Sequence, residues 1–150
     1  MSSESDKSLK GIQKELWADY SETVIDHAQN PRNVGSIPDA DGFGDETGLC
    51  GDTMGIWLKT ANNRIRNVTF WTDGCGTTIA AGSMVTVLAK GKTVIEAAKI
   101  RQQVVLDALG GLPEDSAHCA QLAADTLKRA IKDCLSSKKE PWKRADRSLD

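Results

Sequence analysis

Three of the four cysteines are predicted to lie where loops meet regular structure, beside residues that could share a metal ion or a proton with them. Cys50 is followed two residues later by Asp52, and in an extended segment their side chains would point to the same side. Cys75 lies between two glycines ahead of an expected helix, and His118 directly precedes Cys119 in the first turn of another. Because a helix N-terminus favours negative charge, we expect thiolate character at both Cys75 and Cys119.

Each of these motifs also has a plain structural explanation, and spacing alone does not decide between the two. Cys50 could pack inward from a turn, Cys75 could stand in an ordinary strand-to-helix turn, and His118 could simply be solvated. The chain has no C-x-x-C pair, which argues against a zinc ribbon or finger. Soft thiolates select zinc, copper(I) or iron–sulfur clusters, so the spacing leaves these metals open.

Cys134 is assigned to the hydrophobic core on geometric grounds. A helix predicted from about Asp115 to Leu135 contains both Cys119 and Cys134, 15 residues apart. At a rise of ~1.5 Å per residue they are separated by roughly 22 Å, too far for one small metal site. Cys134 also falls on an apolar stripe where cysteine behaves as a small hydrophobe, together with Ala123, Leu127, Ala130 and Ile131.

The composition sets the class of protein and the state of the thiols. The chain has 150 residues with a formal net charge of −2, which predicts one domain and no electrostatic attraction to nucleic acid. No apolar run reaches membrane-spanning length, and residues 1–10 lack the apolar stretch of a secretory signal. We therefore expect a cytoplasmic protein, not bound to membranes, whose cysteines are free thiols rather than disulfides.

Hydrophobic periodicity predicts an α+β fold in which strands precede most of the helices. A first helix is expected from about Leu16 to the residues before Pro31, which cannot continue it. Strands at 53–60 and 64–72 form a hairpin around residues 61–63, and a third strand is expected just before Cys50. On strand 64–72, alternation places Arg66, Val68 and Phe70 on one face.

Helices are then expected at 77–90, 93–100, 102–109 and over the long segment that ends near Leu135. Residues 1–15 are polar without a helical period and predict a flexible leader. Residues 16–137 are predicted to form the domain, and residues 138–150 a charged C-terminal tail.

Several of these motifs occur together, in one order, in a known family. They are Asp19-Tyr20-Ser21-Glu22, His27 with Asn30-Pro31-Arg32-Asn33-Val34-Gly35, Cys50-Gly51-Asp52, Gly74-Cys75-Gly76 with Ala80-Ala81-Gly82-Ser83, and His118-Cys119. From about residue 17 to 137 the chain resembles the U-type iron–sulfur cluster assembly scaffolds, the IscU and NifU N-terminal domain family.

This resemblance implies a three-stranded antiparallel sheet with helices packed on one face, a two-layer sandwich whose cysteines gather at one tip. It implies a scaffold rather than an enzyme, which assembles a labile [2Fe–2S] cluster and transfers it to recipient apoproteins. Cys50, Cys75 and Cys119 would bind the cluster, with Asp52 or His118 as a weaker fourth ligand. In the family, replacing the aspartate that matches Asp52 makes the cluster easier to retain, so Asp52 is assigned to cluster lability.

The resemblance also implies how sulfur and iron arrive. A cysteine desulfurase would deliver sulfur as a persulfide, with Cys119 as the favoured acceptor and Cys75 as a second candidate. Iron and electrons would come from partners such as a frataxin-like protein and a ferredoxin. In the segment Leu112-Pro113-Glu114-Asp115-Ser116 the chain lacks the lysine of the family's Leu-Pro-Pro-Val-Lys-like motif, which puts recognition by an Hsp70-type chaperone in doubt.

Two other functions use the same residues. A zinc-bound sulfurtransferase would also accept persulfide, but the relative with that function carries an insertion before its third cysteine and lacks the histidine. This chain has His118 and no such insertion, so the sulfurtransferase is the second hypothesis. A structural zinc domain or plain interaction domain is the third. Zinc could also occupy the site of a purified scaffold, so bound zinc alone would not decide among them.

Overall fold

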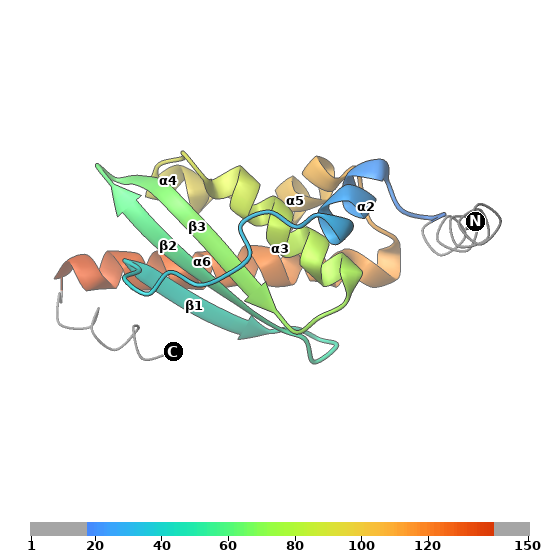
Figure 1. Ribbon diagram of the computed structural model, residues 1–150, viewed down its shortest axis with the longest axis horizontal. Coiled ribbons are helices and arrows are strands. Elements are labelled where there is room, and N and C mark those ends of the chain that lie inside the picture. The colour runs from blue at the N-terminus through green and yellow to red at the C-terminus, as the bar shows by residue number, and fades with distance from the viewer. Residues whose placement is uncertain (1–17, 140–150) are drawn as a thin grey trace, which may run out of the picture.

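The computed structural model describes residues 18–139, which form a three-stranded antiparallel sheet with helices on one face (Figure 1). The strands are β1 (Gly42–Thr47), β2 (Thr53–Ala61) and β3 (Arg64–Thr72), in the order β1-β2-β3. Asn62 and Asn63 both have positive φ in the β2–β3 turn, a conformation that asparagine adopts more readily than most residues. The predicted α+β class, the hairpin and the third strand are confirmed.

The helices form the second layer. They are α2 (Glu22–Gln29), α3 (Gly76–Ala89), α4 (Val94–Ala97), α5 (Gln102–Leu109) and α6 (Ala117–Lys139), with a 3-10 turn at Glu114–Ser116. Helix α6 packs along β1 and β2, and α3 packs on β3. Helix α2 packs against α3, and α5 packs against both α3 and α6. None of the helices in the described part of the chain is long and apolar enough to cross a membrane.

A β-bulge in the hairpin changes which side chains of β3 share a face, so the predicted assignment of these faces was wrong. The pairing between β2 and β3 shifts between Lys59 and Thr60, so Arg66 is an extra residue on its strand. Ile65 consequently turns to the helices, where it is fully buried with Val68 and Phe70, and Arg66 is exposed. Alternation alone had wrongly placed Arg66, rather than Ile65, on the same face as Val68 and Phe70.

The core lies between the sheet and α3 and α6. The inward side chains of β2 are fully buried, and so is the apolar stripe of α6. The buried members of these two elements include Met54, Ile56, Leu58, Ala123, Leu127, Ala130, Ile131 and Cys134. Cys134 is 1% exposed, which confirms its assignment to the core.

Three predicted helix boundaries move because the ends are defined by local hydrogen bonds. Helix α2 begins at Glu22, not near Leu16, because Ser21 caps it by accepting the N–H of Val24 at 3.1 Å. Helix α4 is shorter than 93–100, since i to i+3 bonds close the chain after Ala97. Helix α6 begins after the 3-10 turn rather than at Asp115. The predicted leader 1–15 lies outside the described residues, as does the tail from residue 140 on.

Candidate functional site

Three segments that are distant in the sequence meet at one end of the sheet, on the right in Figure 1. They are the β1–β2 loop with Cys50 and Asp52, the β3–α3 junction with Cys75, and the start of α6 with His118 and Cys119. The Sγ atom of Cys50 lies 3.2 Å from Nε2 of His118, and the same nitrogen lies 3.9 Å from Sγ of Cys119. The imidazole therefore contacts two of the three sulfur atoms.

Asp52 and Cys50 contact different partners in the site. The loop between them turns: Gly51 has a φ of 88°, and its N–H donates to the carbonyl oxygen of Gly48 at 3.0 Å. The Asp52 carboxylate accepts a hydrogen bond of 2.9 Å from the hydroxyl of Thr78. The extended geometry expected between Cys50 and Asp52 was therefore wrong, although both residues lie at the same end of the sheet.

Two threonine hydroxyls at the start of α3 connect Cys75 with Cys119. The hydroxyl of Thr77 lies 3.2 Å from the sulfur of Cys75 and 3.6 Å from that of Cys119. The hydroxyl of Thr78 lies 3.9 Å and 3.5 Å from the same two atoms. Sequence reasoning missed both threonines. The available signal was their position two and three residues after Cys75, because a helix N-cap side chain faces those two positions.

The pKa values of Cys75 and Cys119 shift in opposite directions, although both thiols were expected to have thiolate character. The Thr77 hydroxyl lowers the pKa of Cys75, and the backbone N–H groups of Thr78 and Thr77 at the start of α3 act in the same direction. Burial instead raises the pKa of Cys119, whose hydrogen bonds with Thr78 and Thr77 offset it only in part. Cys119 is 3% exposed, whereas Cys75 is exposed. The helix start therefore favours a thiolate at Cys75, and the expectation for Cys119 was wrong because desolvation is the larger effect.

The side chains are arranged as hydrogen-bond partners of one another. Within residues 18–139, no three histidine, cysteine, aspartate or glutamate side chains already stand as a metal site. The Thr77 and Thr78 hydroxyls contact the sulfur atoms of Cys75 and Cys119, and His118 contacts Cys50. Binding a metal thus requires these side chains to exchange hydrogen bonds for metal bonds. Three soft sulfur donors with a carboxylate and an imidazole fit an iron–sulfur cluster or zinc.

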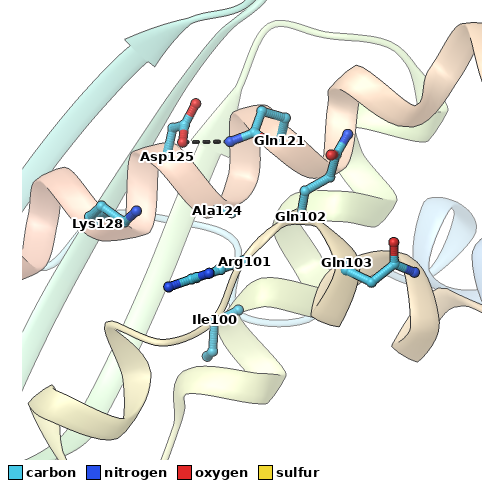
Figure 2. A pocket seen from close by; sticks show the side chains of 8 residues that line it. All are labelled: Ile100, Arg101, Gln102, Gln103, Gln121, Ala124, Asp125 and Lys128. Carbon is cyan, nitrogen blue, oxygen red and sulfur yellow. Dashed lines mark hydrogen bonds between the residues drawn. The ribbon is translucent and has the colours of Figure 1, made fainter.

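Two hollows flank α6 beside this site. One, of about 350 Å³, is lined by Glu46, Thr47, Gly48, Leu49, His118, Gln121, Leu122 and Asp125. The other hollow, of about 300 Å³, lies between the start of α5 and α6 and is lined mainly by polar side chains. At the edge of this second hollow, Gln121 donates a hydrogen bond of 2.7 Å to Asp125 (Figure 2). Leu49, on the first hollow, is 95% exposed next to Cys50. The first hollow thus gives an open approach to the His118 side of the site.

Fold and site together define an α+β domain that presents three cysteines, a histidine and an aspartate at one end of its sheet. Residues 19–141 match the family described as the NifU-like N terminal domain. The chain is 55% identical over 115 residues to the iron-sulfur cluster assembly scaffold protein IscU 1 of Archaeoglobus fulgidus, covering 76% of this chain and 75% of that protein. The chain belongs to the NifU-like N-terminal domain family.

Other relatives agree with this placement. The chain is 43% identical over 120 residues to the scaffold protein IscU of Aquifex aeolicus, covering 78% of this chain and 76% of that one. It is 40% identical over 131 residues to a Drosophila melanogaster protein named iron-sulfur cluster assembly enzyme IscU, covering 83% and 84%. A solved NifU-like N-terminal structure from Brucella abortus shares the fold, with a TM-score of 0.63 at 18% identity over 81% of this chain and 97% of that one.

Proposed function

We propose that this chain is a scaffold on which a labile [2Fe–2S] cluster is assembled and from which it passes to recipient apoproteins. Family membership and relatives named as iron–sulfur cluster assembly scaffolds support the scaffold role. The observation that carries the proposal is the connected set of contacts at one end of the sheet. It runs from Cys50 through His118 to Cys119, and from Cys119 through the Thr77 hydroxyl to Cys75.

Three thiolates are proposed as the firm cluster ligands, and Asp52 or His118 as the exchangeable fourth. A cluster held by four thiolates is tightly bound, whereas a carboxylate or imidazole in one position is a poorer match for iron–sulfur chemistry. Asp52 adjoins Cys119 and Cys75 through a single hydroxyl, so it can reach a cluster bound by those sulfur atoms. This arrangement favours a cluster that can be handed on.

Sulfur is proposed to arrive as the persulfide of a cysteine desulfurase. The acceptor thiolate attacks the outer sulfur atom, a new S–S bond forms on the acceptor, and the thiolate of the desulfurase leaves. Cys119 is the proposed acceptor and Cys75 its competitor. Greater exposure and a lowered pKa favour Cys75 for the first attack, whereas transfer to the buried Cys119 requires its sulfur to become accessible.

The remaining partners follow from this chemistry. A ferredoxin and a frataxin-like protein are proposed to provide electrons and iron, and the protein is proposed to act in the cytoplasm. The open hollow beside His118 and the exposed Leu49 give a donor protein access to the thiols. An Hsp70-type chaperone is not included, because the Leu112–Ser116 segment lacks the lysine of the family motif.

The test is anaerobic reconstitution of the full chain with ferrous iron, cysteine carrying labelled sulfur, and a cysteine desulfurase. Wild type should develop a visible-absorbing cluster that contains the label, and Asp52→Ala should hold that cluster longer when an apo-ferredoxin is added. Cys134→Ala, which removes a core sulfur from α6, is the matched control and should resemble wild type. Absence of a cluster from both wild type and Asp52→Ala would overturn the proposal. Tight stoichiometric zinc with desulfurase stimulation and no cluster would instead identify the zinc-bound sulfurtransferase.

A further inference from the structure

We propose that Thr78 is a positioning residue, whose hydroxyl holds the Asp52 carboxylate beside Cys75 and Cys119. The inference rests on the proposed function, since it states how Asp52 is kept ready to influence release of the cluster. Thr78 is fully buried at the start of α3, yet its hydroxyl has polar neighbours from three separate segments of the chain. A buried hydroxyl in a merely structural role would need only one partner, such as a nearby backbone carbonyl.

The direction of the hydrogen bonds follows from the number of protons. A threonine hydroxyl has one proton to donate, and an ionised carboxylate can only accept. The 2.9 Å contact between Thr78 and Asp52 therefore uses that proton. The Thr78 oxygen atom also lies 3.5 Å from the sulfur of Cys119 and 3.9 Å from that of Cys75. One oxygen atom thus links the carboxylate to both sulfur atoms.

The surroundings show that this placement depends on Thr78. Among residues 18–139, Thr78 is the one side chain that donates a hydrogen bond to the Asp52 carboxylate. Asp52 follows Gly51, in its left-handed turn, and the almost fully exposed Leu49, so its loop is open on the solvent side. Without the Thr78 hydroxyl the carboxylate would be free to rotate into water.

The backbone of Gly74 closes the other side of the pair. A Cβ atom at Gly74 would lie 2.6 Å from Cβ of Thr78 and 2.7 Å from Oδ2 of Asp52, far inside ordinary contact distance. The β3–α3 junction is therefore packed against Thr78 and Asp52 at the same time. A side chain at position 74 would therefore displace Thr78, the Asp52 carboxylate or both.

The test compares Thr78→Val, Thr78→Ser, Asp52→Ala and the double variant Thr78→Val/Asp52→Ala, with Thr126→Val as control. Valine has nearly the volume of threonine and removes only the hydroxyl. Thr126 is also fully buried, two turns beyond Cys119, and its hydroxyl donates to the carbonyl oxygen of Leu122 at 2.7 Å. The control thus removes a buried threonine hydroxyl of the same protein that does not contact the site.

In cluster transfer to an apo-ferredoxin, Thr78→Val should slow release by about three- to tenfold, as expected from the net contribution of one typical hydrogen bond. Thr78→Ser and Thr126→Val should release at the wild-type rate, and the double variant should match Asp52→Ala. In the metal-free protein, Hα–Hβ couplings should show one Asp52 rotamer in wild type and averaging in Thr78→Val.

Three outcomes would overturn the inference: wild-type release from Thr78→Val, the same slowing in Thr126→Val, or additive effects in the double variant. A single Asp52 rotamer in metal-free Thr78→Val would also contradict it. These outcomes are distinct from failure of the proposed function, in which wild type itself would assemble no cluster. The coupling measurement needs no cluster and tests the positioning by itself.

Discussion

Gly44 is predicted to set the distance between β1 and α6, and Gly44→Ala tests how strictly that distance is required. A Cβ atom at Gly44 would lie 2.5 Å from the backbone nitrogen of Ala130 and 2.7 Å from Cβ of Arg129. Ordinary contact begins at 3.4 Å, so β1 and α6 would have to separate by about 0.9 Å. The obstructing atoms belong to the helix backbone or its first side-chain atom, which no rotamer change can move aside.

The expected loss follows from overpacking. Extra methylene groups in a packed core cost about 1–3 kcal/mol, and backbone obstruction favours the upper end of that range. The lower chain entropy of unfolded alanine offsets about 0.4–1 kcal/mol. We therefore expect Gly44→Ala to lose about 2 kcal/mol of unfolding free energy and roughly 4–8 °C of Tm. Because β1 leads to Cys50 and α6 starts beside His118, the contact between these two residues should also lengthen.

Urea unfolding followed by circular dichroism measures this change, with Gly48→Ala as the matched control. A Cβ atom at Gly48 would meet Leu122 Cδ2 at 3.4 Å, an ordinary contact with the end of a flexible side chain. Gly48→Ala should stay within about 0.5 kcal/mol of wild type. Equal unfolding free energies for the two variants would refute the reasoning, because the structure gives only Gly44 of this pair a backbone clash.

Two further predictions concern the thiols and the buried histidine. In the metal-free protein, iodoacetamide at neutral pH should modify Cys75 before Cys119. Thr77→Val should slow modification of Cys75, because the Thr77 hydroxyl lowers the pKa of that thiol. Peptide mass spectrometry measures the order of modification, and faster modification of Cys119 would contradict the prediction. Burial lowers the pKa of His27, whose Nδ1 contacts Ser83 at 2.7 Å, so below pH ~6.5 the unfolded chain binds protons that the folded one does not. The contribution of His27 to the unfolding free energy should therefore be constant above pH ~7 and fall as the pH drops through ~6.5. His27→Gln should flatten the decrease of the unfolding free energy over this pH range. An unchanged pH profile in His27→Gln would show that protonation of His27 does not cause the decrease.

The parts of the fold that could be predicted from sequence were those with a local signal. The Asn62-Asn63 turn, the apolar stripe around Cys134 and the helix that begins after Cys75 each follow from neighbouring residues. The bulge that turns Ile65 inward could not be predicted, because it depends on the register between β2 and β3. The start of α2 could not be predicted either, because it depends on the side chain that caps the helix, which is Ser21.

The site residues also divide into those with a local sequence signal and those whose properties depend on distant segments. Cys50, Cys75 and Cys119 stood out because glycines, an aspartate and a histidine adjoin them in the sequence. The opposite pKa shifts of Cys75 and Cys119 could not be predicted, because they depend on burial by segments distant in the chain. Thr78 was missed for the same reason, since its contacts with Asp52 and Cys119 are made only after the β1–β2 loop and α6 meet α3.

The central claim, that three cysteines jointly hold a cluster, is tested most directly by native mass spectrometry after anaerobic reconstitution. Wild type and Cys134→Ala should both gain the mass of one [2Fe–2S] unit per chain. Cys50→Ala, Cys75→Ala and Cys119→Ala should each lose that species while remaining folded by circular dichroism. A full cluster on any of these three variants, or its loss from Cys134→Ala with the fold intact, would contradict the account.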